Sequence, residues 1–202
     1  SANGNDASQG TAGNRPTYQA DGGDGFPAAS FDGTTDLLEI TDAGSIGSTT
    51  AFSVSMWIRT GATFPTDGTI IAQWGGTERF LMRVETGGNL VVSISDGSAG
   101  TGTAAAVLAI SKWYHVAFTY DGAGTGNAGR LKVFLNGVPL TLSFAGTVPA
   151  TTGNPTTILS IVSRNAASTY FNGYADDIVF VDNRAMTEEE ILLHYFYRPR
   201  SG

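Results

Sequence analysis

The chain has 202 residues, of which 27 are glycine and none is cysteine, and its formal net charge is −7. Without cysteine, a disulfide framework, a thiolate zinc site and a cysteine nucleophile are all excluded. The two lysines, Lys112 and Lys132, stand apart and no apolar run approaches the roughly 18 residues of a membrane span, so neither nucleic acid nor membrane insertion is expected.

Residues 1–28 are polar and rich in glycine, and they form the first unit of the predicted organisation. We predict an N-terminal arm or linker over this range, packed in part through Tyr18 and Phe26. From residue 29 to 202, short apolar runs alternate with turn dipeptides, and 41% of the whole chain is apolar. That content is enough for one hydrophobic core, so residues 29–202 are predicted to form a single β domain.

Alternation of apolar and polar side chains with a period of two marks the strands. In the run 52–58 every even position is apolar, and Tyr114, Val116, Phe118 and Tyr120 repeat the pattern. Segments 96–103 and 121–129 are rich in glycine and are predicted to be exposed loops. The predicted strands are 29–32, 36–41, 51–60, 68–74, 79–85, 89–95, 104–110, 113–121, 130–136, 138–144, 156–163 and 174–181.

Turn and cap signals complete the predicted architecture. Asn136-Gly137 lies between two such strands and predicts a type I′ hairpin. Thr187 and Glu190 have the spacing of a capping box, and the apolar run 191–196 follows them, so one short helix is predicted there. The sequence therefore predicts an all-β fold, a two-sheet antiparallel sandwich or jelly roll with one short C-terminal helix.

Five segments, taken in chain order, resemble the concanavalin A-like, laminin-G-type jelly-roll domains of secreted bacterial and phage proteins. They are 31–40, 52–58, 113–122, 131–137 and 171–191. The resemblance implies two curved antiparallel sheets that face each other. Because this family includes sugar-binding modules, adhesion domains and glycan-cleaving enzymes, its fold leaves the function open.

Catalysis is not expected from the residues present. Hydrolysis of a glycosidic bond needs a pair of carboxylates, and the related hydrolases carry a Glu-x-Asp-x-Glu pattern that this sequence lacks. Glu188, Glu189 and Glu190 are explained by the helix N-terminus. The two histidines, His115 and His194, do not have the spacing of a zinc site. We therefore predict no catalytic residues and no enzyme.

A sugar site requires an aromatic ring beside planar polar groups. Trp74 ends a predicted strand before Gly75-Gly76, which would leave its ring partly exposed, although a lid over the core is the alternative. Trp57 and Trp113 match positions that the family uses mostly in its core. The predicted ligand-binding residues are Trp74, Arg79, Arg83, Tyr170 and Tyr174.

A structural calcium ion is the cofactor that the resemblance implies, at the point where the first strand meets the last. The matching carboxylates are Asp32, Asp36 and Asp177. Oxygen ligands from loops suit Ca²⁺. The alternative is that Asp32-Gly33 is only a turn and that an aspartate pairs with an arginine.

The sequence favours a non-catalytic recognition module that binds a glycan or another surface ligand, within a secreted or surface-displayed protein. One alternative is a decoration or fibre domain of a phage virion, in which residues 1–28 would order on assembly. A glycan-cleaving enzyme is the second alternative, disfavoured by the missing carboxylate pair. The expected location is extracellular or on a virion surface.

Overall fold

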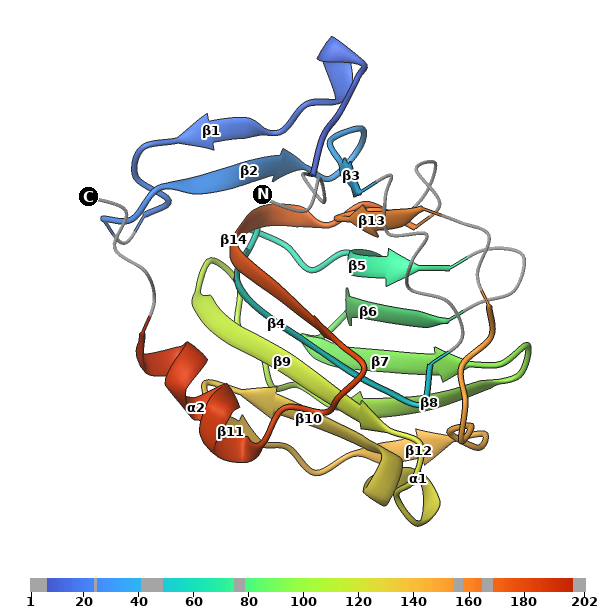
Figure 1. The fold of residues 1–202 in the computed structure, drawn as a ribbon. Helices are drawn as coiled ribbons and strands as arrows, with labels where there is room; N and C mark the ends of the chain where they lie inside the picture. Colours follow the sequence, from blue (N-terminus) through green and yellow to red (C-terminus); the bar gives the residue numbers. More distant parts are fainter. Residues whose placement is uncertain are drawn as a thin grey trace.

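The computed structural model describes residues 7–23, 25–40, 49–74, 79–154, 158–164 and 169–197. Two antiparallel sheets of seven strands each face one another and enclose the core (Figure 1). The predicted two-sheet jelly roll is therefore confirmed.

Sheet I has the strand order β1-β2-β14-β4-β9-β10-β11, and its middle strands are the longest in the chain. The alternation predicted from the sequence sends Phe52, Val54, Met56 and Ile58 into the core, while Ser55 lies on the opposite face of the sheet. Its strands are β1 (Thr17–Gln19), β2 (Ala28–Asp32), β14 (Asn172–Asp182), β4 (Ala51–Thr60), β9 (Trp113–Asp121), β10 (Leu131–Leu135) and β11 (Val138–Pro139).

Sheet II has the order β12-β8-β7-β6-β5-β13-β3 and forms the other wall of the core. Its strands are β12 (Ser143–Ala145), β8 (Ala99–Ala104), β7 (Asn89–Ser95), β6 (Phe80–Glu85), β5 (Asp67–Gln73), β13 (Leu159–Ile161) and β3 (Leu38–Ile40). Phe52 and Phe118 from sheet I meet Phe80 from sheet II, with ring centroids 5.1–5.7 Å apart. These aromatic contacts join the two layers at the centre of the sandwich.

Of the N-terminal arm, the structure describes residues 7–23 and 25–28. The arm includes a single 3₁₀ turn, η1 (Ala12–Asn14), and the short strand β1, which pairs with β2 so that Thr17 faces Ser30. Farther along the arm, the carbonyl of Gly22 accepts a hydrogen bond from the indole Nε1 of Trp113 at 3.2 Å. Tyr18, in contrast, is 73% exposed.

Three predicted segments differ from the structure, and a fourth, the predicted strand 138–144, is divided between β11 in sheet I and the start of β12 in sheet II. The segment 96–103, predicted to be a loop, contains most of β8, and the predicted strand 104–110 holds only the last residue of β8 followed by turns. The glycines of β8 reflect close packing, because a Cβ on Gly100 would collide with the backbone of Val148. Ala106 has a φ of 53°, which is incompatible with a continuing strand.

In the predicted loop 121–129, a short helix α1 (Gly126–Arg130) forms.

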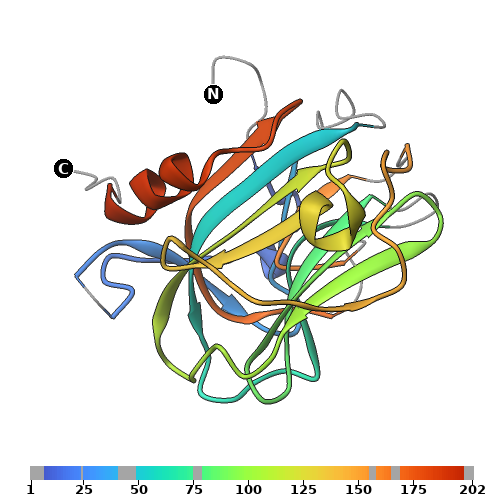
Figure 2. The ribbon, with the colours of Figure 1, turned by 90° about the horizontal axis from the view of Figure 1, so that it is seen from below.

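The hairpin and the C-terminal helix follow the prediction. Asn136 and Gly137 have φ angles of 52° and 79°, as a type I′ turn requires, and they join β10 to β11. Helix α2 (Glu188–Phe196) begins at a complete capping box between Thr187 and Glu190. It packs on the face of sheet I that is turned away from sheet II (Figure 2), where Met186 and Ile191 contact Ala117 and Phe134.

Candidate functional site

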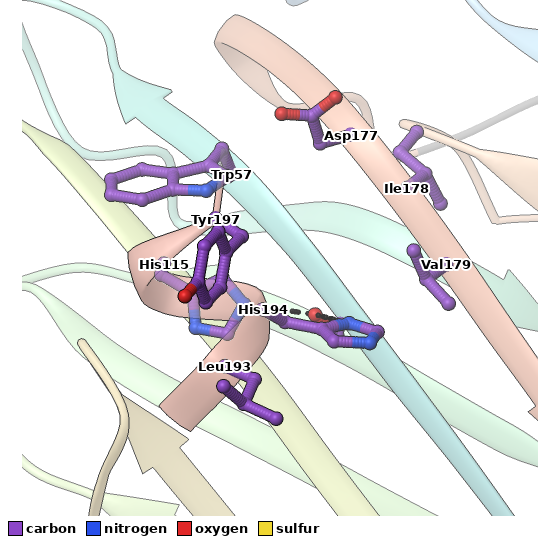
Figure 3. Close-up of a pocket in the computed structure, with 9 residues that line it drawn as sticks. Trp57, His115, Asp177, Ile178, Val179, Leu193, His194 and Tyr197 are labelled. Atoms are coloured by element: carbon purple, nitrogen blue, oxygen red, sulfur yellow. Dashed lines mark hydrogen bonds between the residues drawn. The ribbon is translucent and has the colours of Figure 1, made fainter. Parts of the chain in front are cut away.

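A pocket of about 440 Å³ lies between α2 and the outer face of sheet I (Figure 3). Strands β4 and β9 supply its floor, the bulged middle of β14 supplies one wall, and the end of α2 supplies the other. The lining residues are Ser55, Trp57, His115, Asp177, Ile178, Val179, Leu193, His194 and Tyr197. Its volume is typical of pockets that hold small molecules.

The strand register brings the floor residues together. Trp57 on β4 is directly opposite His115 on β9, and Ser55 lies two residues before Trp57 on the same face. Since successive side chains alternate between the two faces of a sheet, all three face α2 rather than the core. Trp57 therefore faces outward, half-buried, and does not occupy the core position that its place in the family suggested.

The wall from β14 depends on a β-bulge. The pairing of β14 with β4 shifts register between Asp176 and Val179, and Asp177 adopts a φ of 47°. An extra residue in a strand bends it and redirects the neighbouring side chains. The bulge thereby turns Asp177, Ile178 and Val179 toward the pocket, where they contribute one carboxylate and two apolar groups.

Ser55 links the floor to the helix. Its Oγ lies 2.8 Å from His115 Nε2 and 3.2 Å from His194 Nδ1. His115 is 1% exposed, and burial together with the nearby His194 lowers its pKa to about 4. At neutral pH the ring of His115 is therefore uncharged and serves as a hydrogen-bonding group.

Aromatic rings cover the apolar part of the site. Tyr195 of α2 stacks on Trp57, with centroids 5.7 Å apart and ring planes inclined by 25°. Tyr197, which follows α2, is 74% exposed and lies at the rim of the pocket. The arrangement offers an apolar surface beside a few hydrogen-bonding groups, which suits a small polar ligand with an apolar face.

The predicted ligand residues do not form one site. Arg79 is completely buried and has an ion pair with Asp182, so no outside molecule reaches its side chain in this structure. Arg83 pairs with Glu85, with Nη2 and Oε1 2.6 Å apart. Trp74 is half-buried at the end of β5 in sheet II.

The two predicted tyrosines lie elsewhere. Tyr170 forms an isolated bridge with Thr69, at the opposite end of β5 from Trp74. Tyr174 is on β14 in sheet I, where the guanidinium of Arg59 lies 5.2 Å from the centre of its ring and Trp113 packs at 6.2 Å. The five residues are thus distributed over two sheets.

The predicted calcium ligands are also separated. The carboxylate of Asp32 accepts hydrogen bonds from the backbone and hydroxyl groups of Thr34 and Thr35, and Asp36 accepts one from the backbone N–H of Asp32. These bonds hold the pKa of Asp32 well below its usual range against the opposing effect of burial. Asp32 pairs with Asn172, whereas Asp177 lies five residues farther along β14, so the three carboxylates do not converge.

Among the residues that the structure describes, no group of three or more potential metal-binding side chains forms a site. Calcium binding by Asp32, Asp36 and Asp177 stays a prediction. A rise in melting temperature on adding calcium after chelation, lost in Asp32→Asn, would support it, and an unchanged melting curve would contradict it.

A second pocket, of about 540 Å³, opens at the edge of the sandwich between β2 and β3. Apolar side chains such as Ala28 and Leu38 form most of its lining, and the exposed Tyr18 is its aromatic residue. Asp177 and Ile178 line both pockets from the bulge. We favour the pocket beneath α2 as the functional site because it combines aromatic rings with hydrogen-bonding side chains.

The sequence analysis named Asp177 only as a calcium ligand and considered His115 and His194 only to set aside a zinc site. It missed Ser55 and the grouping of these residues in one pocket. Part of this grouping was predictable, because the alternation in β4 and β9 places Ser55, Trp57 and His115 on one face of the sheet. The docking position of α2 and the bulge in β14 had no recognisable sequence signal.

The sequence profile of the concanavalin A-like lectin/glucanase superfamily matches residues 32–192. The chain belongs to this superfamily. A search of curated proteins finds no match. No helix within the described residues is both long and apolar enough to cross a bilayer.

Several solved structures share the fold at low sequence identity. Domain 4 of the extracellular arabinanase AbnA from Geobacillus stearothermophilus, solved with arabinotriose, has a TM-score of 0.60 and 19% identity, over 91% of this chain and 81% of that one. The binding domain of botulinum neurotoxin serotype G has a TM-score of 0.65 and 13% identity, over 93% of this chain and 48% of that one. The binding domain of Paraclostridial Mosquitocidal Protein 1 has a TM-score of 0.66 and 13% identity, over 91% and 47%. The chain thus spans about half the length of these two binding domains.

Proposed function

We propose that this chain is a non-catalytic glycan-binding module of a secreted or surface-displayed protein, and that a sugar ring occupies the pocket beneath α2. The observation that carries the proposal is the position of Trp57 and Tyr197 beside Ser55 and His194 in one pocket. A pyranose or furanose presents C–H groups to an aromatic face and hydroxyl groups to polar side chains, which is the chemistry that this lining offers.

Two further observations support the proposal. The chain belongs to a superfamily of lectins and glucanases, and the arabinanase domain of similar fold was solved with an oligosaccharide. Glycoside hydrolysis requires two carboxyl groups on either side of the scissile bond. Asp177 is the one carboxylate among the described lining residues, which favours binding over cleavage.

The first experiment is a glycan array that includes arabino-oligosaccharides, followed by calorimetric titration of the best ligand. Tyr197→Ala and Tyr18→Ala form a matched pair, because the two tyrosines are 74% and 73% exposed but only Tyr197 lines this pocket. We expect Tyr197→Ala to raise the Kd about fivefold, since an aromatic contact is worth about 1 kcal/mol, and Tyr18→Ala to leave it unchanged.

Two other results would contradict the proposed site or the proposed function. Loss of binding in Trp74→Ala with no effect of Tyr197→Ala would move the site to the end of β5, as the sequence predicted. An array with no bound glycan would contradict the proposed function and favour a role in virion assembly.

A further inference from the structure

The hydroxyl of Ser55 contacts ring nitrogens of two histidines, and this arrangement restricts where the protons lie. Its Oγ is 2.8 Å from His115 Nε2 and 3.2 Å from His194 Nδ1. A serine hydroxyl has one proton and two lone pairs, so it donates to at most one of the two rings. If it accepted from both rings, its own buried O–H would have no acceptor among the described residues, so it donates to one ring and accepts from the other. Two opposite directions of the chain of hydrogen bonds are therefore conceivable.

The surroundings of His115 distinguish these directions. His115 Nδ1 is buried and has no hydrogen-bond partner among the residues that the structure describes. If Ser55 donated to His115 Nε2, the single proton of the neutral ring would lie on Nδ1 and form a buried N–H group with no acceptor. Buried N–H groups without an acceptor are rarer in proteins than acceptors with an unused lone pair. The opposite direction, in which His115 Nε2–H donates to Ser55 and Ser55 donates to His194 Nδ1, leaves only a lone pair unpaired.

We infer that Ser55 is a positioning residue that holds both histidines in the Nε2–H tautomer and so makes His194 a hydrogen-bond donor toward the pocket. His194 Nδ1 is occupied as the acceptor from Ser55, and its proton therefore lies on Nε2. His194 lines the pocket, and its ring extends away from α2 (Figure 3). The lowered pKa of the buried His115, about 4, keeps the His115 ring neutral at pH 7.

The consequence for recognition rests on the proposed function and makes it more specific. An Nε2–H group binds an oxygen lone pair, so the sugar atom next to His194 is an acceptor, either a hydroxyl oxygen or a ring oxygen. Because the tautomer is set before the ligand arrives, the donor does not need to reorganise on binding.

The direct test uses ligand-free protein labelled with ¹⁵N, in which long-range ¹H–¹⁵N spectra distinguish protonated from unprotonated ring nitrogens. At pH 7 we expect protonated Nε2 and unprotonated Nδ1 in both His115 and His194. A protonated Nδ1 in either ring, or a mixture of tautomers, would overturn the inference. The wild-type spectra decide this point without any variant and without a ligand.

Variants test whether Ser55 is the cause. In Ser55→Ala we expect His194 to show a mixture of tautomers. The control is Ser53→Ala, which removes a hydroxyl two residues earlier on β4. That hydroxyl accepts a hydrogen bond from the backbone N–H of Met186 at 2.8 Å. An unchanged His194 spectrum in Ser55→Ala would show that Ser55 does not position the ring.

Ligand binding provides the second readout. With the best glycan from the array, we expect Ser55→Ala to weaken binding about two- to tenfold, as for loss of one neutral hydrogen bond. If the tautomers are as inferred and no glycan binds, the proposed function fails while the positioning role of Ser55 stands. If glycans bind equally well to Ser55→Ala, the positioning role in recognition is contradicted while the proposed function stands.

Discussion

Arg79 Nη2 lies 3.5 Å from Asp182 Oδ1, and the arginine side chain of this pair is completely buried. Its guanidinium also lies over the rings of Phe52 and Phe180, 4.7 and 5.8 Å from their centres. Burial lowers the pKa of Arg79 to about 10, against the opposing effect of Asp182. The arginine is thus still charged at neutral pH, and Asp182 compensates that charge.

The ion pair of Arg79 and Asp182 predicts that substituting one partner lowers the free energy of unfolding more than substituting the other. Asp182→Asn leaves a buried cation without its counter-charge, and we expect it to lower the free energy of unfolding by about 2 kcal/mol. Arg79→Met keeps the apolar volume, and the aspartate that remains is partly exposed, so a smaller loss is expected. Urea denaturation of both variants and of the double variant measures this. A larger loss in Arg79→Met than in Asp182→Asn would contradict the role given to the charge.

His115 predicts how stability depends on pH. The titratable groups near it are His194 and Tyr195 of α2 and Asp177 of the β14 bulge. An unfolded chain protonates this histidine below about pH 6.5, whereas the folded chain resists protonation down to about pH 4. Stability should therefore fall as the pH is lowered across this window, by up to about 3 kcal/mol from this one group.

The measurement is urea unfolding of wild type and His115→Gln at pH 7 and pH 4.5. We expect the variant, which has no ring to protonate, to lose less stability between the two pH values than the wild type. Equal losses in the two proteins would show that other groups cause the acid sensitivity.

The capping box of α2 predicts a further stability difference. Thr187 Oγ1 accepts a hydrogen bond from the backbone N–H of Glu190, whose carboxylate also receives a bidentate pair from Arg184. We expect Thr187→Ala to lower the free energy of unfolding by about 1 kcal/mol. The control is Thr125→Ala, because Thr125 is the N-cap of α1 but makes no side-chain cap bond. Similar melting temperatures for the two variants would contradict a stabilising cap.

Local signals in the sequence predicted most of the fold. Alternation in β4 and β9, the Asn136-Gly137 turn and the capping box each act over a few residues, and each is present as predicted. In β8, which was predicted to be a loop, Gly100 is required by the close approach of the backbone of Val148, a residue far along the chain. Such a contact depends on tertiary packing, which composition does not reveal.

The site was less predictable for the same reason. Arg79 has the sequence context of an exposed strand residue, yet a partner more than 100 positions away makes its burial possible. The pocket combines β4, β9, the bulge of β14 and the end of α2, and only the register of the folded sheet brings Ser55 next to His115 and His194. Single residues such as His115 were visible in the sequence, but their grouping was not.

The most direct test of glycan binding beneath α2 is titration of the best array ligand into the wild type, Tyr197→Ala and Tyr18→Ala. We predict saturable binding to the wild type, about fivefold weaker binding to Tyr197→Ala, and wild-type affinity for Tyr18→Ala. Equal affinity of all three proteins for the glycan would contradict the placement of the sugar in this pocket, and absence of binding to the wild type would contradict the function itself.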